Sequence, residues 1–356
     1  MMSAAIALKR EDAEKRASSA DLAEQTAQRV TRTLQDKIEL IQEVTRRTKI
    51  LAINASIESA RAGQAGRSFA IVAEEVRAIS HEIDALAQSL RSELVSQVGD
   101  MRTRAREMAE SAAHKRLIDL SLNAVELIDR NLYERSCDVR WWATDAAVVA
   151  GAASASADDC AFASERMGVI LNAYTVYLDL WLCDRAGNVI ANGRPDRYRT
   201  AGANVAHERW FKQAMQTSSG DDYVCADIAQ NKHLNDAAVA TYAAAVRENG
   251  DPRGRVIGVL GVHFDWTPQA QTIVTSLRLT PEEWAHTRAM LLDHDGRVIA
   301  ASDNHGLLTE TFPLEHQGRT QGAYVTPNGD TIGFALTPGY ETYRGMGWYG
   351  CVVTRG

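Results

Sequence analysis

Histidine side chains offer this chain's most versatile chemistry, because an imidazole can bind a metal or haem and titrates near neutral pH. His207, His233 and His263 are spread along the second half of the sequence. Their spacing matches no metal-binding motif, so the default interpretation is that each is solvated or hydrogen-bonded. Asp265, close to His263, would raise that imidazole's pKa through its charge. A metal- or haem-dependent redox sensor stays open as one alternative function.

Catalytic motifs are absent from the sequence, which contains no P-loop, no HExxH and no nucleophile elbow. The five cysteines form no CxxC pair, so they predict neither a metal site nor a disulfide framework. They are Cys137, Cys160, Cys183, Cys225 and Cys351. We therefore expect a protein that is not an enzyme, has no cofactor and works in a reducing compartment.

A protein-binding surface is predicted in the first third of the chain. Ile50, Ile53 and Ile57 recur at helical spacing but miss the apolar seam that holds Leu51 and Ala55. An isoleucine stripe that a helix does not need for its own packing predicts a docking strip for another protein. The alternatives are a wider seam, or burial in the four-helix bundle of a homodimer.

Long helices must position this strip. Residues 1–62 contain neither proline nor glycine, and a seam of alternating three- and four-residue steps over 20–58 is mostly apolar. A second seam over 69–90 is apolar at every step. Two seams joined by a short glycine-containing segment predict an antiparallel coiled-coil hairpin with its tip at 62–67.

The stretch KILAINASIESARAGQAGRSFAIVAEEVR (residues 49–77) resembles the kinase-control tip of the methyl-accepting chemotaxis transducers. The resemblance implies a cytoplasmic hairpin that pairs into a four-helix homodimer and associates as a trimer of dimers. It also implies that the tip binds the chemotaxis histidine kinase and its coupling adaptor. Besides the three isoleucines, the matching positions are Asn54, Glu58, Arg61, Ala62, Gly63, Gly66, Arg67, Phe69 and Val72.

Several features depart from this family's pattern. Arg47 and Lys49 replace glutamine and asparagine, and their positive charge beside the strip would weaken or replace the standard partner; Gln64 and Ser68 also differ. For the family's methylation sites, the pair Glu24–Gln25 is the candidate, although a solvated helix face explains it equally well. In membrane-bound members the sensor precedes the hairpin, whereas here the order is reversed, and missing N-terminal sequence with an anchor is one explanation.

The second half of the chain contains an internal repeat. Helical periodicity continues to about residue 150, and β-rich runs begin near residue 174. LWLCDRAGNVIANG (180–193) and MLLDHDGRVIAAS (290–302) share the frame D-x-x-G-x-V-I-A. Each copy predicts a strand, a tight Asp/Gly turn and a second strand. We therefore expect two related α+β modules.

This layout resembles the double Cache sensor domains, in which a long helix precedes two PAS-like modules and the first module usually holds the ligand. HERWFKQAM (207–215) is similar to the family's helix around R-x-W-Y-x-x-A, and YVCADI (223–228) to the strand beyond it. The fold class is therefore α+β. The expected parts are a hairpin (1–109), a long helix with the helical start of the sensor (110–173), a first Cache module (174–284) and a second, smaller one (285–356).

The resemblance also implies a ligand site. In amino-acid-binding members, an arginine two residues before the tryptophan grips the ligand carboxylate, and an aspartate in the module's last strand grips the ammonium. Here Glu208 and His263 occupy those positions, so a cationic, neutral or aromatic molecule is expected rather than a typical α-amino acid. The candidate pocket residues are Tyr198, Glu208, Trp210, Phe211, Tyr223, Asp227, Tyr242 and His263. The alternative is that Trp210, Phe211 and His263 belong to the core.

Charge and hydropathy exclude two classes of partner. The chain has 356 residues and a net charge of −7 without a concentrated basic run, which argues against nucleic-acid binding. It also lacks the apolar stretch of about 20 residues that crosses a membrane, so a cytoplasmic location is expected. The favoured function is a chemotaxis-type transducer whose sensor biases a kinase-coupling hairpin. A ligand-binding dimer whose hairpin is only a dimerisation rod is the second alternative.

Overall fold

The computed structural model describes the backbone of residues 2–200 and 202–356, and the side chains of residues 25–200 and 202–356. The chain divides into two compact units, Met1–Ala113 and His114–Gly356, whereas the sequence predicts the division between 109 and 110. Within the described part of the chain, no helix combines the length and the apolar content that a bilayer span requires.

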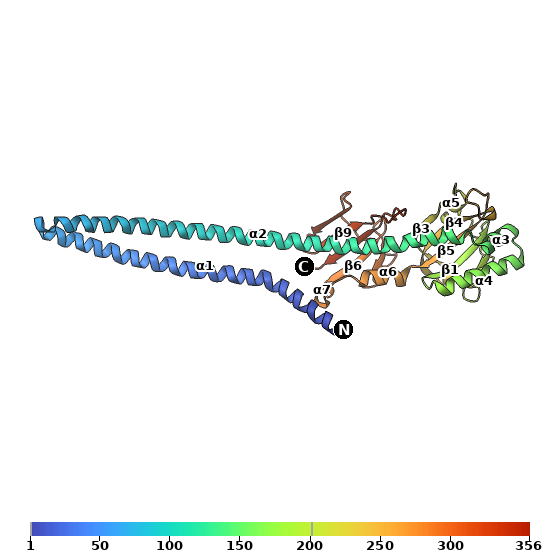
Figure 1. Ribbon diagram of the computed structural model, residues 1–356, viewed down its shortest axis with the longest axis horizontal. Helices are drawn as coiled ribbons and strands as arrows, with labels where there is room; N and C mark the ends of the chain where they lie inside the picture. The colour runs from blue at the N-terminus through green and yellow to red at the C-terminus, as the bar shows by residue number, and fades with distance from the viewer. Residues whose placement is uncertain (1, 201) are drawn as a thin grey trace. The chain divides into compact units, whose positions relative to one another are not determined.

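The first unit contains two long helices. Helix α1 (Met2–Arg61) leads into the 3₁₀ turn η1 (Gly63–Gly66), and α2 (Arg67–Trp142) then runs back beside α1 (Figure 1). Residues of high helix propensity, with no glycine or proline before residue 63, explain the length of α1. Gly63 adopts a left-handed φ of +59°, which starts the turn at low steric cost.

Small side chains are buried where the two helices meet. They recur every seven residues, so each series lies on one side of its helix. The buried small residues are Thr45, Ala52 and Ser59 on α1, and Ala73, Ser80 and Ala87 on α2; Ile38, seven residues before Thr45, is the one large member of the α1 series among the described residues. Small residues at a contact allow two helix axes to approach closely.

The prediction that the apolar seams form the contact between the two arms within one chain is wrong. Leu51 is 68% exposed and Phe69 is 73% exposed. Further exposed members are Leu34, Ile41, Val44, Val72, Ile79, Ile83, Leu86 and Leu90, whereas Ala27 is buried. Two helices bury only one narrow stripe each, and the line of small residues occupies it. The larger residues flank that stripe, where only additional helices would cover them.

In the second unit, α2 ends earlier than the sequence predicts. The helix that was expected to reach about residue 150 stops at Trp142, and α3 (Ala146–Ser154) and α4 (Ala157–Ala173) follow. The break occurs because Asp145 caps a new helix, its carboxylate accepting the Ala147 N–H at 2.9 Å.

The first module contains a five-stranded antiparallel sheet in the order β2-β1-β5-β4-β3. Its strands are β1 (Tyr177–Asp184), β2 (Val189–Asn192), β3 (Val224–Asn231), β4 (Ala237–Arg247) and β5 (Val256–Asp265). Helix α5 (Arg209–Met215) and two short 3₁₀ turns, η2 (Lys232–Leu234) and η3 (Glu248–Gly250), complete it. One face of the sheet packs with α2, α3 and α4, and the other packs with α5.

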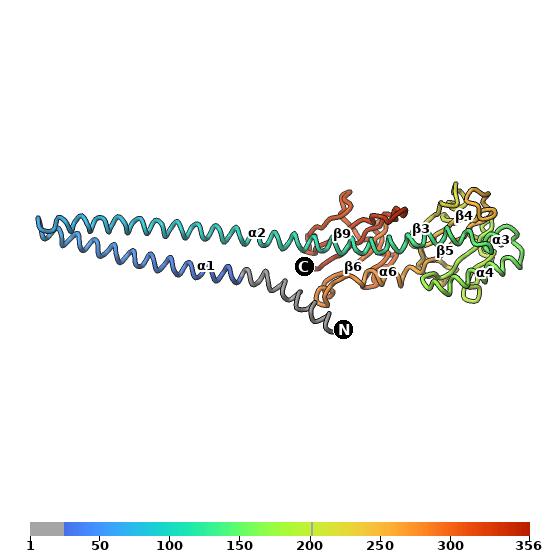
Figure 2. The backbone as a smooth tube through the Cα atoms, viewed as in Figure 1, coloured from blue at the N-terminus to red at the C-terminus, as the bar shows by residue number. Residues whose placement is uncertain are grey.

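The second module repeats this topology strand for strand, in the order β7-β6-β10-β9-β8. Figure 2 traces its backbone in orange to red. Its strands are β6 (Thr287–Leu292), β7 (Val298–Ala301), β8 (Gln321–Val325), β9 (Thr331–Leu336) and β10 (Tyr349–Thr354). Helices α6 (Trp266–Thr275) and α7 (Pro281–Trp284) precede it. Two antiparallel sheets after long helices confirm the α+β class.

The internal repeat has the same local structure in both modules. The Asp184 carboxylate accepts N–H bonds from Ala186 and Asn188 across the β1–β2 turn, and Gly187 has a φ of +85°. In the β6–β7 turn, Asp293 accepts the equivalent bonds and Gly296 has a φ of +80°. The strand register also repeats, since Trp181 pairs with Asn192 as Met290 pairs with Ala301, with an irregularity one residue later in both modules.

Candidate functional site

The predicted docking strip is exposed within the single chain. Ile50, Ile53 and Ile57 are 46%, 40% and 48% exposed. They lie on the last turns of α1, just before the turn at Gly63–Gly66. Side chains of this size left open on one helix favour a binding surface over core packing within the chain.

Charged side chains near the strip form local pairs. Glu58 and Arg61 make an ion pair at 2.7 Å. Glu43 accepts hydrogen bonds from Arg46 and Arg47, which lower the pKa of its carboxyl to about 2. The positive charge that Arg47 adds is therefore partly neutralised within α1. Of the methylation candidates, Gln25 is exposed, and the side chain of Glu24 lies outside the described residues.

In the second unit, four of the predicted pocket residues come together on the α5 face of the first sheet. Tyr198, Trp210, Phe211 and His263 are all buried. The Trp210 ring lies 6.1 Å from that of Phe211 and 6.0 Å from that of His263, measured between centroids. This burial is what the core alternative predicts, and a ligand would have to displace these side chains to reach the sheet.

Three further residues of this cluster were missed by the sequence argument. The Trp181 ring lies 4.0 Å from the His263 ring, and the Thr241 hydroxyl lies 3.2 Å from His263 Nδ1. Asp179 is opposite His263 in the strand register, and its buried carboxylate accepts bonds from Trp181 Nε1 and Asn192 Nδ2. An aspartate in the middle of an apolar strand was the signal that could have found it.

The expectation that Asp265 raises the pKa of His263 is wrong. Burial is the larger cause and the positive charge of nearby His233 the smaller one, and together they lower this pKa to about 3. His263 Nε2 has no hydrogen-bond partner among the described residues. The imidazole is therefore neutral at physiological pH.

The remaining candidates do not share this pocket, so the eight residues do not form a single site. Glu208 lies half-exposed at the start of α5 and pairs with His207 at 3.1 Å. Tyr242 follows Thr241 on β4 and therefore projects from the opposite face. There its hydroxyl donates to that of Tyr343 at 3.4 Å, and its ring is 6.4 Å from the Tyr223 ring.

Asp227 belongs to the contact between the two modules, where its carboxylate accepts from Trp348 Nε1 at 3.0 Å. The three histidines of the metal hypothesis lie in different environments, since His207 and His233 are exposed and His263 is buried. Across the described residues, no group of three or more His, Cys, Asp or Glu side chains is arranged to hold a metal ion.

A buried carboxyl connects α2 with the loop before β10. Asp129 is 1% exposed, and its Oδ2 accepts the Gly339 N–H at 2.7 Å. Its Oδ1 has no partner among the described residues. Burial, with a smaller contribution from the charge of Glu126, outweighs the lowering by the Gly339 hydrogen bond and raises the pKa of this carboxyl to about 6.

Replacing Asp129 by asparagine is expected to flatten the pH dependence of stability. A raised folded-state pKa means that protonation stabilises the fold below the unfolded pKa of about 4, and that this contribution is lost as pH rises through about 6. The full effect is at most about 3 kcal/mol. Urea unfolding at pH 4.5 and pH 7 measures it, with Asp119→Asn, an exposed site on α2, as the control. An equal change in the free energy of unfolding between the two pH values in both variants would contradict the prediction.

Comparison with known proteins finds a family match for the N-terminal part of the chain and a structural similarity for the rest. Residues 5–168 match the family model of the methyl-accepting chemotaxis protein (MCP) signalling domain. Methyl-accepting chemotaxis protein McpG of Pseudomonas putida is 47% identical over 55 residues, which are 15% of this chain and 9% of McpG. The chain thus corresponds to a small part of that relative. The sequence match supports a chemotaxis-type signalling segment.

The sensor unit resembles solved sensor domains. The sensory domain of the Campylobacter jejuni chemoreceptor Tlp3 aligns with a TM-score of 0.53 and 16% identity, covering 70% of this chain and 96% of that one. The Vibrio cholerae histidine kinase DctB sensor domain aligns with a TM-score of 0.51 and 14% identity, covering 71% and 99%. At this identity the comparisons show a shared fold.

Proposed function

We propose that this protein is a chemotaxis-type signal transducer, in which a small molecule binds the sensor unit and changes the activity of a partner at the hairpin tip. The match of residues 5–168 to the MCP signalling domain is the observation that carries this proposal. The exposed isoleucine strip supplies a surface for the partner. The partners proposed are the chemotaxis histidine kinase and its coupling adaptor, in the cytoplasm.

The proposal includes a homodimer. The exposed seams of α1 and α2 flank the line of small residues, so a second hairpin would bury them in a four-helix bundle. Association of dimers into trimers at the tip extends this proposal. A dimerisation rod without kinase coupling is the second candidate, because the same exposed seams favour it equally.

The Ile53→Asp variant distinguishes the two. Ile53 lies outside the seams, so an aspartate there should leave the dimer intact. The same change should abolish binding to the kinase and adaptor, because an aspartate buried at an apolar contact is strongly disfavoured. Pull-down with both purified partners and light scattering measure the two properties. Leu40→Asp, an exposed site farther from the tip on α1, is the matched control and should bind normally.

If neither the native chain nor Leu40→Asp binds the kinase or the adaptor, the dimerisation rod is favoured. If Ile53→Asp unfolds the hairpin or dissociates the dimer, the strip belongs to the core of the assembly instead.

A further inference from the structure

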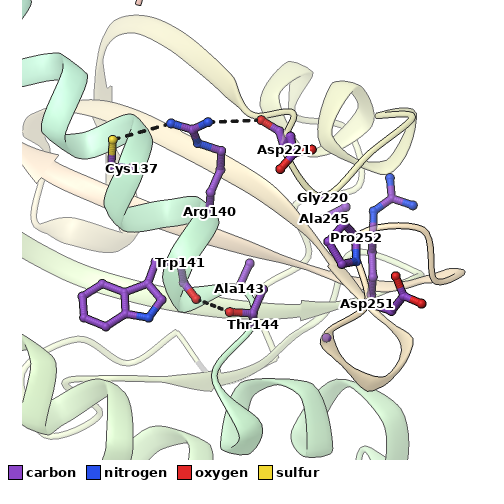
Figure 3. A pocket seen from close by; sticks show the side chains of 12 residues that line it. Cys137, Arg140, Trp141, Ala143, Thr144, Gly220, Asp221, Ala245, Asp251 and Pro252 are labelled. Carbon is purple, nitrogen blue, oxygen red and sulfur yellow. Dashed lines mark hydrogen bonds between the residues drawn. The ribbon is translucent and has the colours of Figure 1, made fainter. Parts of the chain in front are cut away.

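A cavity of about 320 Å³ lies in the sensor unit, away from the aromatic cluster around His263. Three segments line it: the end of α2 with the residues just after it, the loop before β3, and the end of β4 with the loop that leads to β5 (Figure 3). Gly220 N–H donates to the Pro252 carbonyl at 2.9 Å and so holds the two loops together. The volume is at the small end of the range for small-molecule sites.

Two arginines give this cavity a positive charge. Arg140 is half-buried and donates to the main-chain carbonyls of Ser136 at 2.8 Å and Asp221 at 3.4 Å. Arg247 is 7% exposed and donates to the carbonyls of Gly254 and Thr217. Its Nε has no partner among the described residues. All these acceptors are neutral main-chain carbonyls, so they offset neither positive charge; the carboxylate of Asp222, whose pKa the charge of Arg247 helps to lower, offsets part of the Arg247 charge.

Two carboxylates also line the cavity, and their position decides the net effect. Asp221 and Asp251 are both exposed, and Figure 3 shows the Asp251 carboxylate on the far side of the cavity from Arg140. Water screens an exposed charge several-fold more strongly than the protein screens a buried one. The buried charge of Arg247 and the half-buried charge of Arg140 therefore outweigh these carboxylates inside the cavity.

The rest of the lining is mostly apolar. Ala143, Ala245 and Pro252 contribute to it, together with the hydroxyl-bearing Thr144. Trp141 also lines the cavity, but Figure 3 shows its indole ring directed away from Pro252. Apolar side chains near a guanidinium suit a ligand with an apolar or aromatic body and one acidic group, since a guanidinium binds a carboxylate through two parallel hydrogen bonds.

We propose that this cavity binds a small organic anion, with its carboxylate on Arg140 and its apolar body against Ala245 and Pro252. This site deepens the sensing role proposed above and rests on it only for the signalling consequence. Arg140 and Trp141 lie in the last turn of α2, the helix that begins at the hairpin turn. A ligand here would thus contact the same helix that carries part of the predicted partner surface.

Binding to the full chain tests the proposal with three probes of one skeleton: 3-phenylpropanoate, 3-phenylpropan-1-ol and 3-phenylpropylamine. Isothermal titration calorimetry should detect binding of the carboxylate at millimolar concentration, and neither of the other two. Arg140→Gln should weaken binding about tenfold, as expected for the loss of a charge-assisted hydrogen bond. Asp221→Asn should strengthen it several-fold, because it removes a repelling charge.

Arg253→Gln is the matched control, because Arg253 is an exposed residue of the β4–β5 loop that does not line the cavity. It should bind like the native chain. Absence of carboxylate binding, equal binding of the alcohol, or unchanged affinity in both Arg140→Gln and Asp221→Asn would overturn the proposal. The experiment uses no kinase, so its failure is distinguishable from a failure of partner docking at the hairpin.

Discussion

Gly66→Ala is expected to destabilise the hairpin unit by roughly 3 kcal/mol, whereas Gly63→Ala should cost only about 1 kcal/mol. A Cβ on Gly66 would overlap the main-chain carbonyl of Ser59, which cannot move unless α1 moves with it. A Cβ on Gly63 meets no atom within 4 Å, so alanine there has only the strain of the left-handed backbone. The two glycines are three residues apart, which makes them a matched pair.

Thermal unfolding followed by far-ultraviolet circular dichroism measures the difference, because helices dominate the signal of the hairpin unit. The hairpin unit of the Gly66 variant should unfold with a clearly lower midpoint temperature than that of the Gly63 variant. Equal losses would mean that the close approach to Ser59 does not control the turn.

Acid is expected to destabilise the sensor unit through His263. The pKa of this imidazole is lowered to about 3, so the neutral form is the one that the fold accepts. Its contribution is fully present above the unfolded pKa of about 6.5 and is lost as pH falls from there towards 3. The expected loss is about 2 kcal/mol at pH 5 and on the order of 4 kcal/mol at pH 3.

His263→Gln should remove this dependence, since glutamine keeps a polar group of similar length without a titrating ring. Urea unfolding at pH 7 and pH 5 measures the free energy of unfolding in each variant. His207→Gln, at an exposed position, serves as the control and should retain the native loss. A native-like loss in His263→Gln would assign the acid sensitivity to another group. Asp129 acts in the opposite direction, so the Asp129→Asn background isolates the histidine.

Local patterns in the sequence predicted the features that depend on neighbouring residues. The backbone freedom of glycine explains the turn at Gly63–Gly66. It also explains the turns at Gly187 and Gly296, each of which has in addition an aspartate that accepts main-chain N–H bonds. The β-rich repeat predicted two modules, and the two sheets have that arrangement.

Other features depend on contacts that a sequence pattern does not specify. The helices of the hairpin carry more than one stripe of suitable residues, and periodicity alone does not say that Ala52 and Ser80 form the contact rather than the larger Leu51 and Ile79. The resemblance selected Tyr242 for a pocket, but strand alternation places it behind the sheet. The sequence did not predict the cavity around Arg140, because its lining residues come from segments far apart in the chain.

The repeated strand register has a chemical consequence. Asp179 lies two residues before Trp181, and Arg288 lies two residues before Met290, so these two residues occupy equivalent sites in the two modules. Asp179 is held by Asn192 and Trp181, whereas Arg288 is held by Glu310 and Asp303. One structural position thus has an acidic residue in the first module and a basic residue in the second. A small molecule that donates hydrogen bonds to that place in the first module would meet only donors at the same place in the second.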